Sequence, residues 1–245
     1  MKSSLKFKLL IVFLLAALFR LYGLNWDQSH HLHPDERFLT MVTGAVSWSN
    51  LNPYDAGYSF FVYGTLPMKI VKLLAEFVKV DIYDYNNITL VGRIVSAFFD
   101  LGTVFFIFKI GKKIFNSRIG LLAALLYASA VLPIQLSHFY AVDTFLVFFL
   151  TFSFYFLILY TIHHTPYTSA ALGCAFGLAL ACKISAVLFL PIIILGYLYL
   201  LFKKRNFRLL AISSMLFIVF CYLSFRLADP KAFSDNNFFN LIPNP

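Results

Sequence analysis

Residues 168–202 read TSAALGCAFGLALACKISAVLFLPIIILGYLYLLF, an apolar stretch of 35 residues in which Lys183 is the single charged side chain. As one helix this stretch would be about 50 Å long, because an α-helix rises about 1.5 Å per residue. The hydrocarbon core of a bilayer is only about 30 Å thick. We therefore expect two shorter membrane-spanning helices joined by a turn near Cys182 and Lys183, with a single tilted helix as the alternative.

The whole chain has the composition of an integral membrane protein. Of its 245 residues, 60% are hydrophobic and 13% are charged, and the mean hydropathy is +0.79. This leaves too little polar surface for a soluble domain. The apolar runs are continuous over about twenty residues, which favours helices over a β-barrel. Seven spans are predicted, over residues 8–24, 90–110, 118–136, 141–162, 167–181, 184–202 and 207–226.

The distribution of charge predicts the orientation in the membrane. With a cytoplasmic N-terminus and seven spans, the inside segments hold eleven Lys and Arg residues and no acid, while ten of the eleven acids lie outside or at outer helix ends. Basic residues accumulate on the cytoplasmic side. We therefore expect a multi-pass plasma-membrane protein with its N-terminus inside. The cytoplasmic loops explain the net charge of +9, so this charge indicates no nucleic-acid partner.

Residues 25–89 form the one long polar segment, and they are expected to be the first external loop. Within it, residues 36–48 and 66–80 have the apolar periodicity of amphipathic helices, which commonly lie on the membrane surface. The loop also carries an acidic pair, Asp35 and Glu36, in the stretch HLHPDER. Carboxylates beside a membrane are costly unless they have a function or lie in water.

Five segments, in their order along the chain, form a recognisable set. They are HPDE (33–36), FVYGTLP (61–67), VGRIVSAFFD (91–100), HFYAVDTFLVFF (138–149) and GLALACKISAVLFLP (177–191). Together they resemble the GT-C glycosyltransferases. The most similar group is glycosyltransferase family 39, the protein O-mannosyltransferase and aminoarabinose transferase relatives, also called phospholipid carrier-dependent glycosyltransferases. The resemblance implies a polytopic all-α bundle over residues 1–245, corresponding to the N-terminal part of longer family members.

The resemblance implies inverting transfer of a sugar from a polyprenyl-phosphate carrier to a lipid, glycan or protein acceptor at the outer face. Such a transfer needs a base for the acceptor and stabilisation of the departing phosphate. By resemblance, Asp35 is the general base, Glu36 orients the catalytic site or its loop, and Asp143 lies at the mouth of the cavity. The alternative for each acid is a helix cap. The basic residue that the family usually has before the second acid is missing in HFYAVD.

Basic side chains on the same side are candidates for binding the donor phosphate. Lys183 and Arg93 would pair with it, and the alternative is that they extend to lipid headgroups. His138 is a further substrate-binding candidate. Lys69 and Lys72 are expected to contact only lipid headgroups. Asp100, inside the second span, is expected to pair with a neighbour such as Arg93.

A divalent cation is a further candidate component of this site. His30, His31 and His33 crowd beside Asp35, and His31 and His33 are the weak candidates for its ligands. Their spacing matches no standard metal site, so a solvated or hydrogen-bonded cluster is the alternative.

A second class of protein also fits the polar groups within the spans. Arg93 and Asp100 would suit a transporter, or a flippase for lipid-linked sugar. Transporters typically contain repeated halves, and no internal repeat is found here. The long outer loop favours the enzyme.

Overall fold

The computed structural model describes residues 2–53, 55–58, 62–204, 206–230 and 232, and every regular element within them is helical. The expected all-α fold is therefore confirmed. The elements are α1 (Lys2–Leu21), α2 (Pro34–Ala45), α3 (Leu66–Phe77), α4 (Tyr85–Ile114), α5 (Ser117–Ala128), α6 (Val131–Ser137), α7 (Val142–His163), α8 (Pro166–Leu180), the 3-10 helix η1 (Ile184–Phe189), α9 (Leu190–Lys204) and α10 (Phe207–Ala228).

The seven predicted spans coincide with helical segments, but length and composition support fewer crossings. Within the described residues, four segments are long and apolar enough to cross a membrane: α4, α7, η1 with α9, and α10. A fifth is added if α5 and α6, which are bent by 60° to each other, form one span. Helix α8 is apolar but has only 15 residues. The apolar run 168–202 is broken at Lys183, as its length predicted.

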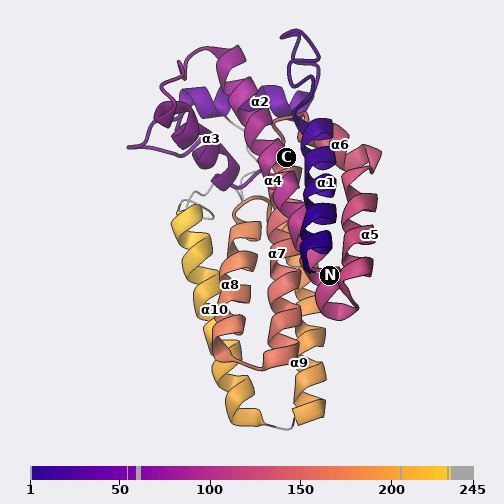
Figure 1. Cartoon of the computed structure of the whole chain (residues 1–245). Helices are drawn as coiled ribbons and strands as arrows, with labels where there is room; N and C mark the ends of the chain where they lie inside the picture. The colour runs from indigo at the N-terminus through magenta and orange to yellow at the C-terminus, as the bar shows by residue number, and fades with distance from the viewer. Residues whose placement is uncertain (1, 54, 59–61, 205, 231, 233–245) are drawn as a thin grey trace, which may run out of the picture.

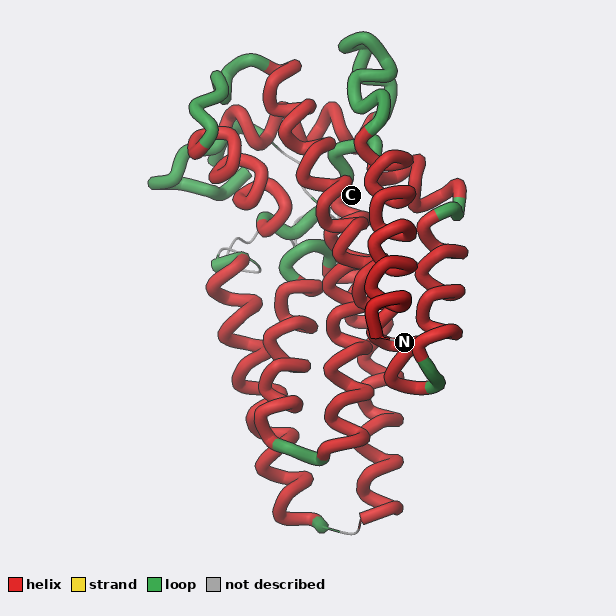
Figure 2. Tube along the Cα trace, viewed as in Figure 1, coloured by secondary structure: helices red, strands yellow, loops and turns green. Residues whose placement is uncertain are grey.

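The long helices run side by side, and α2, α3 and α6 lie at one end of the bundle (Figure 1). Figure 2 shows that the longer loops gather at this same end, whereas the connections at the opposite end are short. The segments predicted to face outside therefore lie together. We call this end of the molecule the loop end.

Helix α3 packs on the protein through one face and leaves further apolar side chains exposed on another. Met68 and Val71 are fully buried, whereas Phe77 is 80% exposed. The buried face also includes Lys72, which is 2% exposed. Its Nζ atom lies 3.7 Å from Glu76 Oε1. The expectation that Lys72 contacts only lipid headgroups is therefore wrong. The exposed apolar face suits the predicted position on the membrane surface.

Small residues bring the helices of the bundle close together. A Cβ added at Gly173 or Gly177 of α8 would collide with backbone oxygens of α10. Close backbone approach at small residues is a common way of packing helices in membranes. This contact fixes α8, and with it the turn at Lys183, relative to α10.

Candidate functional site

Four segments from different parts of the chain meet at the loop end. Asp35 is the second residue of α2, and Asp143 is the second residue of α7. Lys183 caps the N-terminus of η1. Tyr63 lies in the loop before α3. Three of these residues were singled out in the sequence, and Tyr63 was not.

Tyr63 connects the other three residues. The Asp35 carboxylate lies close enough to the Tyr63 phenol to act on it through its charge. The Lys183 Nζ atom lies 5.9 Å from the centre of the Tyr63 ring, and 3.1 Å from Asp143 Oδ1. Burial, the charge of Asp35 and, more weakly, that of Asp143 raise the pKa of Tyr63 to about 12. The phenol is therefore protonated at neutral pH.

The charged groups of this cluster remain accessible. The side chains of Lys183 and Asp143 are 32% and 33% exposed, and Asp35 is half-buried. An ion pair with this exposure contributes little to stability. Two carboxylates and an ammonium are thus held together within reach of a ligand.

The backbone holds Tyr63 in place. The Gly64 N–H donates to the Cys182 carbonyl at 2.9 Å, and the Leu66 N–H donates to the Ala181 carbonyl at 3.1 Å. A Cβ on Gly64 would collide with the Ala181 carbonyl, so only glycine permits this approach. The loop that carries Tyr63 is thereby fixed to the turn that carries Lys183.

The same loop is also tied to the end of α10. The Lys69 Nζ atom donates to the Ala228 carbonyl at 2.6 Å, and the Thr65 N–H donates to Asp229 Oδ2 at 3.3 Å. Lys69 was expected to contact only lipid headgroups. The structure instead gives it an internal partner.

Glu36 and Arg93 form a buried cluster behind the accessible one. Glu36 is fully buried and Arg93 is 1% exposed. The guanidinium donates to both Glu36 oxygens at 2.7 and 2.6 Å, to both Asp27 oxygens at 3.0 and 2.7 Å, and to the Leu24 carbonyl at 2.7 Å. These contacts use all five N–H donors of the arginine. Glu36 also accepts from the Tyr140 N–H at 2.8 Å.

This cluster gives Arg93 a role that differs from the predicted binding of the donor phosphate. Arg93 has no N–H left for a substrate phosphate, and Glu36 has no exposed oxygen for catalysis. The hydrogen bonds from Arg93 lower the pKa of Asp27 to about 2, against the opposing effect of burial. Together these residues hold the start of α2, and therefore Asp35, against α4 and the start of α7.

Asp100 pairs with Arg20, not with Arg93 as expected. Arg20 of α1 forms a buried ion pair with Asp100, and Tyr127 donates to Asp100 Oδ1 at 2.6 Å. Arg93 and Asp100 are seven residues apart, so their positions on α4 differ by about 10 Å along the helix axis. Arg20, at the end of the first apolar segment, was missed. Its position as a lone base there was the available signal.

His138 makes structural contacts only with backbone groups. Its Nδ1 atom lies 2.7 Å from the Ile134 carbonyl and its Nε2 atom lies 2.9 Å from the Tyr22 carbonyl. Both ring nitrogens thus face backbone carbonyls, and the Nε2 contact joins the end of α6 to the loop after α1. The structure gives His138 this anchoring role in place of the predicted substrate contact.

The histidines beside the acidic pair have different hydrogen-bond partners in the structure. Among the described residues, the one group with suitable geometry for a metal is Asp27, His31 and Glu36, whose ligand atoms lie within 4.8 Å of one another. Both carboxylates already pair with Arg93, whose charge would repel a cation. His33 instead caps α2 by accepting from the Glu36 N–H at 3.4 Å. The geometry favours an ion-paired cluster over a metal centre.

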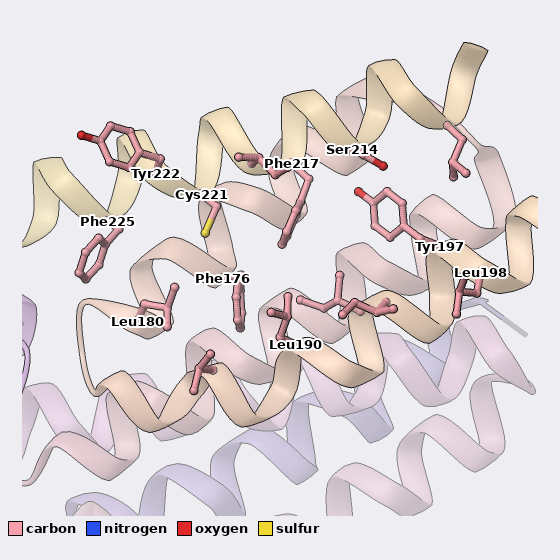
Figure 3. Close-up of a pocket in the computed structure, with 15 residues that line it drawn as sticks. Phe176, Leu180, Leu190, Tyr197, Leu198, Ser214, Phe217, Cys221, Tyr222 and Phe225 are labelled. Carbon is pink, nitrogen blue, oxygen red and sulfur yellow. The ribbon is translucent and has the colours of Figure 1, made fainter. Parts of the chain in front are cut away.

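An apolar groove of about 610 Å³ lies between α8, η1 with α9, and α10 (Figure 3). Leu180 and Phe225 lie at one end of it, and Tyr197 and Leu198 lie at the other (Figure 3). Leu180 is three residues before Lys183, so the groove approaches the cluster at the loop end. The lining residues are Phe176, Leu180, Val187, Leu190, Ile193, Ile194, Tyr197, Leu198, Leu210, Ser214, Phe217, Ile218, Cys221, Tyr222 and Phe225.

Comparison with solved structures supports the expected fold. The chain is similar to a chain of the Saccharomyces cerevisiae protein O-mannosyltransferase Pmt1–Pmt2 complex bound to the sugar donor, with a TM-score of 0.74 and 15% identity. The match covers 94% of this chain and 34% of that chain, so this chain spans about a third of the length of its structural relative. No curated protein matches the chain.

A family model matches more than half of the chain. Residues 85–227, from the start of α4 almost to the end of α10, match the model described as dolichyl-phosphate-mannose-protein mannosyltransferase. This region contains Asp143 and Lys183, while Asp35 and Tyr63 precede it. The resemblance expected from the sequence is confirmed, and the chain belongs to the dolichyl-phosphate-mannose-protein mannosyltransferase family.

Proposed function

We propose that the protein is a membrane glycosyltransferase that moves a sugar from a polyprenyl-phosphate carrier to a hydroxyl group of an acceptor. The observation that carries this proposal is the cluster of Asp35, Tyr63, Asp143 and Lys183. It combines a carboxylate that can act as base with an ammonium that can bind phosphate. Family membership favours this enzyme over the transporter or flippase.

The apolar groove supports a lipid-linked donor. A polyprenyl phosphate has a long hydrocarbon chain and an anionic headgroup, so its site needs an apolar surface that ends beside a cation. The groove between α8 and α10 has apolar walls and begins three residues from Lys183. A soluble sugar nucleotide would gain nothing from such a surface.

Asp35 acts as the general base in the proposed reaction. Its carboxylate accepts the proton of the acceptor hydroxyl as the hydroxyl oxygen attacks the anomeric carbon of the sugar. The bond between that carbon and the phosphate oxygen breaks, and its electron pair leaves with the polyprenyl phosphate. Attack opposite to the leaving group inverts the anomeric configuration.

Lys183 stabilises the phosphate, and Asp143 holds Lys183 in place before the donor binds. The two groups lie 3.1 Å apart, and each side chain is about one-third exposed. Replacing the Asp143 carboxylate by a phosphate as the partner of the ammonium therefore costs little. The phosphate oxygens then replace Asp143 as partners of the ammonium. Charge-assisted hydrogen bonds of this kind strengthen as the leaving group gains charge.

We place this reaction at the outer face of the membrane. The loop end contains the segments that the sequence predicts to be external. The eleven basic residues of the predicted inside segments belong to other parts of the chain. The acceptor would then be a lipid, glycan or protein on that side.

The donor class can be tested with membranes that contain the protein. We expect transfer of label from a polyprenyl-phosphate sugar and none from a nucleotide sugar. Lys183→Met should raise the KM for the lipid-linked donor by about 10- to 100-fold, because a charged hydrogen bond to the phosphate is lost. Lys79→Met, at an exposed position beyond α3, is the control and should leave this KM unchanged. Transfer from the nucleotide sugar alone would contradict the proposal.

A further inference from the structure

The end of the bundle opposite the loop end carries basic side chains without acidic partners. Between Asp100 and Asp229 the sequence has one acid, Asp143, and it begins α7 at the loop end. The connections α4–α5, α7–α8 and α9–α10 lie at the opposite end (Figure 1). Among the described residues, no ion pair joins the bases at these connections to an acid. These bases include Lys112, Lys113, His163, His164, Lys203 and Lys204.

Two of these bases, from different helices, are in contact. The Lys113 Nζ atom lies 3.2 Å from His163 Nε2. Because an ammonium can only donate, this imidazole nitrogen is the acceptor. One turn earlier on α4, the Lys109 Nζ atom lies 5.8 Å from the centre of the Tyr155 ring of α7. The basic face of α4 therefore packs against the end of α7.

Helix α9 brings two more lysines to the same region. The rings of Tyr160 in α7 and Tyr197 in α9 lie 4.8 Å apart, and both helices run away from the loop end (Figure 1). His164 is four residues after Tyr160, and Lys204 is seven residues after Tyr197. At a rise of about 1.5 Å per residue, Lys204 therefore lies only about 5 Å beyond His164 along the bundle. A lysine side chain can span this difference.

His164 occupies a backbone position that favours glycine. Its φ is +56°, in the left-handed region, and its N–H donates to the Tyr160 carbonyl at 2.8 Å where α7 ends. Glycine or asparagine is usual at such a helix end. The imidazole also has a buried Nδ1 atom without a hydrogen-bond partner among the described residues. Both features cost free energy, and both are explained if the ring serves a ligand.

Exposed aromatic side chains lie at the same end of the bundle as the bases. Phe115 follows α4, Tyr167 lies in the first turn of α8, and Phe202 and Phe207 flank the α9–α10 connection. Each of the four is between 66% and 85% exposed. Exposed aromatic residues at helix ends are typical of the membrane–water interface, where phospholipid headgroups lie. The bases are therefore placed at the depth of lipid phosphates.

We propose that the phosphate of an anionic phospholipid binds to a basic cluster made of Lys113, His163, His164, Lys203 and Lys204. The ammonium groups contact the phosphate oxygens, and the His164 ring turns to offer its free nitrogen to one of them. The general preference of bases for one side of a membrane explains the charge of this end. It does not explain a histidine at a position that favours glycine.

An anion would also relieve repulsion within the basic cluster. Burial and, next, the charges of Lys204 and Lys203 lower the pKa of His164. A bound phosphate offsets these charges. The cluster lies at the other end of the molecule from the proposed sugar-transfer site, so its test needs no enzymatic activity.

Lipid binding can be measured on the purified protein in a neutral detergent, by native mass spectrometry and by the unfolding temperature. We expect phosphatidylglycerol to bind and to raise the unfolding temperature. Phosphatidylcholine, whose headgroup has no net charge, should bind more weakly. Inorganic phosphate at the same concentration should have no effect, because it has no acyl chains to lie beside the exposed aromatic rings. Equal binding of the two lipids, or an equal effect of inorganic phosphate, would overturn the proposal.

Lysine variants test whether the cluster is the site. Lys113→Gln and Lys204→Gln should each lower the affinity for phosphatidylglycerol about fivefold, the usual contribution of one base near a membrane surface. Lys79→Gln removes the same charge from an exposed position beyond α3, and it should leave the affinity unchanged. An equal loss in Lys79→Gln and Lys113→Gln would show attraction by net charge alone and would overturn the site.

His164→Gly separates lipid binding from folding. Glycine suits the left-handed backbone, so the unfolding temperature without anionic lipid should be unchanged or higher. The affinity for phosphatidylglycerol should nevertheless fall by about three- to tenfold, because a hydrogen bond to the phosphate is lost. A His164→Gly protein that binds this lipid like the wild type would contradict the assignment of the imidazole to the site.

Discussion

The backbone N–H of Gly64 donates to the Cys182 carbonyl at 2.9 Å, and this contact joins the loop before α3 to the turn between α8 and η1. These two segments are more than a hundred residues apart, yet each carries a residue of the candidate site. Tyr63 precedes the glycine, and Lys183 follows the cysteine. The separation of the two side chains therefore depends on a backbone contact that other residue types would obstruct.

Gly64→Ala tests this contact. The added methyl group meets the Ala181 carbonyl, so the loop must shift, at a cost of about 1 to 3 kcal/mol. We expect a lower unfolding temperature in detergent and a reduced rate of sugar transfer. Gly44→Ala is the control, because its Cβ would lie 3.3 Å from the nearest atom and requires only a small adjustment. Equal behaviour of the two variants would contradict the importance of the Gly64 contact.

Arg93→Met tests whether Arg93 stabilises the fold or binds the substrate. The substitution leaves Asp27 and Glu36 buried without their partner, and removing one member of a buried ion pair costs about 3 to 5 kcal/mol. We expect a large loss of thermal stability. A variant that unfolds like the wild type but binds the donor weakly would restore the phosphate-binding role that the sequence predicted.

Asp143→Asn should strengthen donor binding. The ammonium of Lys183 loses its competing partner, and an exposed ion pair is worth up to about 1 kcal/mol, or about fivefold in affinity. The donor KM should therefore fall by up to this factor, with little change in stability. A rise in KM would indicate that Asp143 itself contacts the donor.

The orientation can be tested by cysteine labelling. Ser49 lies in the loop between α2 and α3, and Ser117 begins α5 at the opposite end of the bundle (Figure 1). The excess of bases in the inside segments predicts that Ser49→Cys is labelled by an impermeant reagent in intact cells and that Ser117→Cys is protected. Labelling with the reverse pattern would place the candidate site on the cytoplasmic side.

The helices could be predicted from the sequence because each depends on local composition. The break at Lys183 follows from an apolar run too long for one span, and the start of α2 follows from Pro34 and the acidic pair. The number of crossings could not be settled in this way. Helix α8 is short, and α5 and α6 are bent relative to each other.

The contacts within the candidate site were harder to predict, because long-range partners leave no local pattern. Asp35, Asp143 and Lys183 were predicted to lie on the same side of the membrane, which suggested a single site. In the structure all three lie around Tyr63. Tyr63 itself lies in an irregular loop without periodicity. The pairing of Arg93 with Asp27 depends on how the loop after α1 folds back, which no spacing in the sequence indicates.

The proposed reaction depends on Asp35 as the base of a sugar transfer from a polyprenyl-phosphate carrier. The most direct measurement compares the transfer rates and donor binding of the wild type, Asp35→Asn, and Asp81→Asn at an exposed acid of the same loop. We expect Asp35→Asn to lower the rate by about 10²- to 10⁴-fold while donor binding is retained, and Asp81→Asn to behave like the wild type. An Asp35→Asn variant that transfers sugar at the wild-type rate would contradict the proposed reaction.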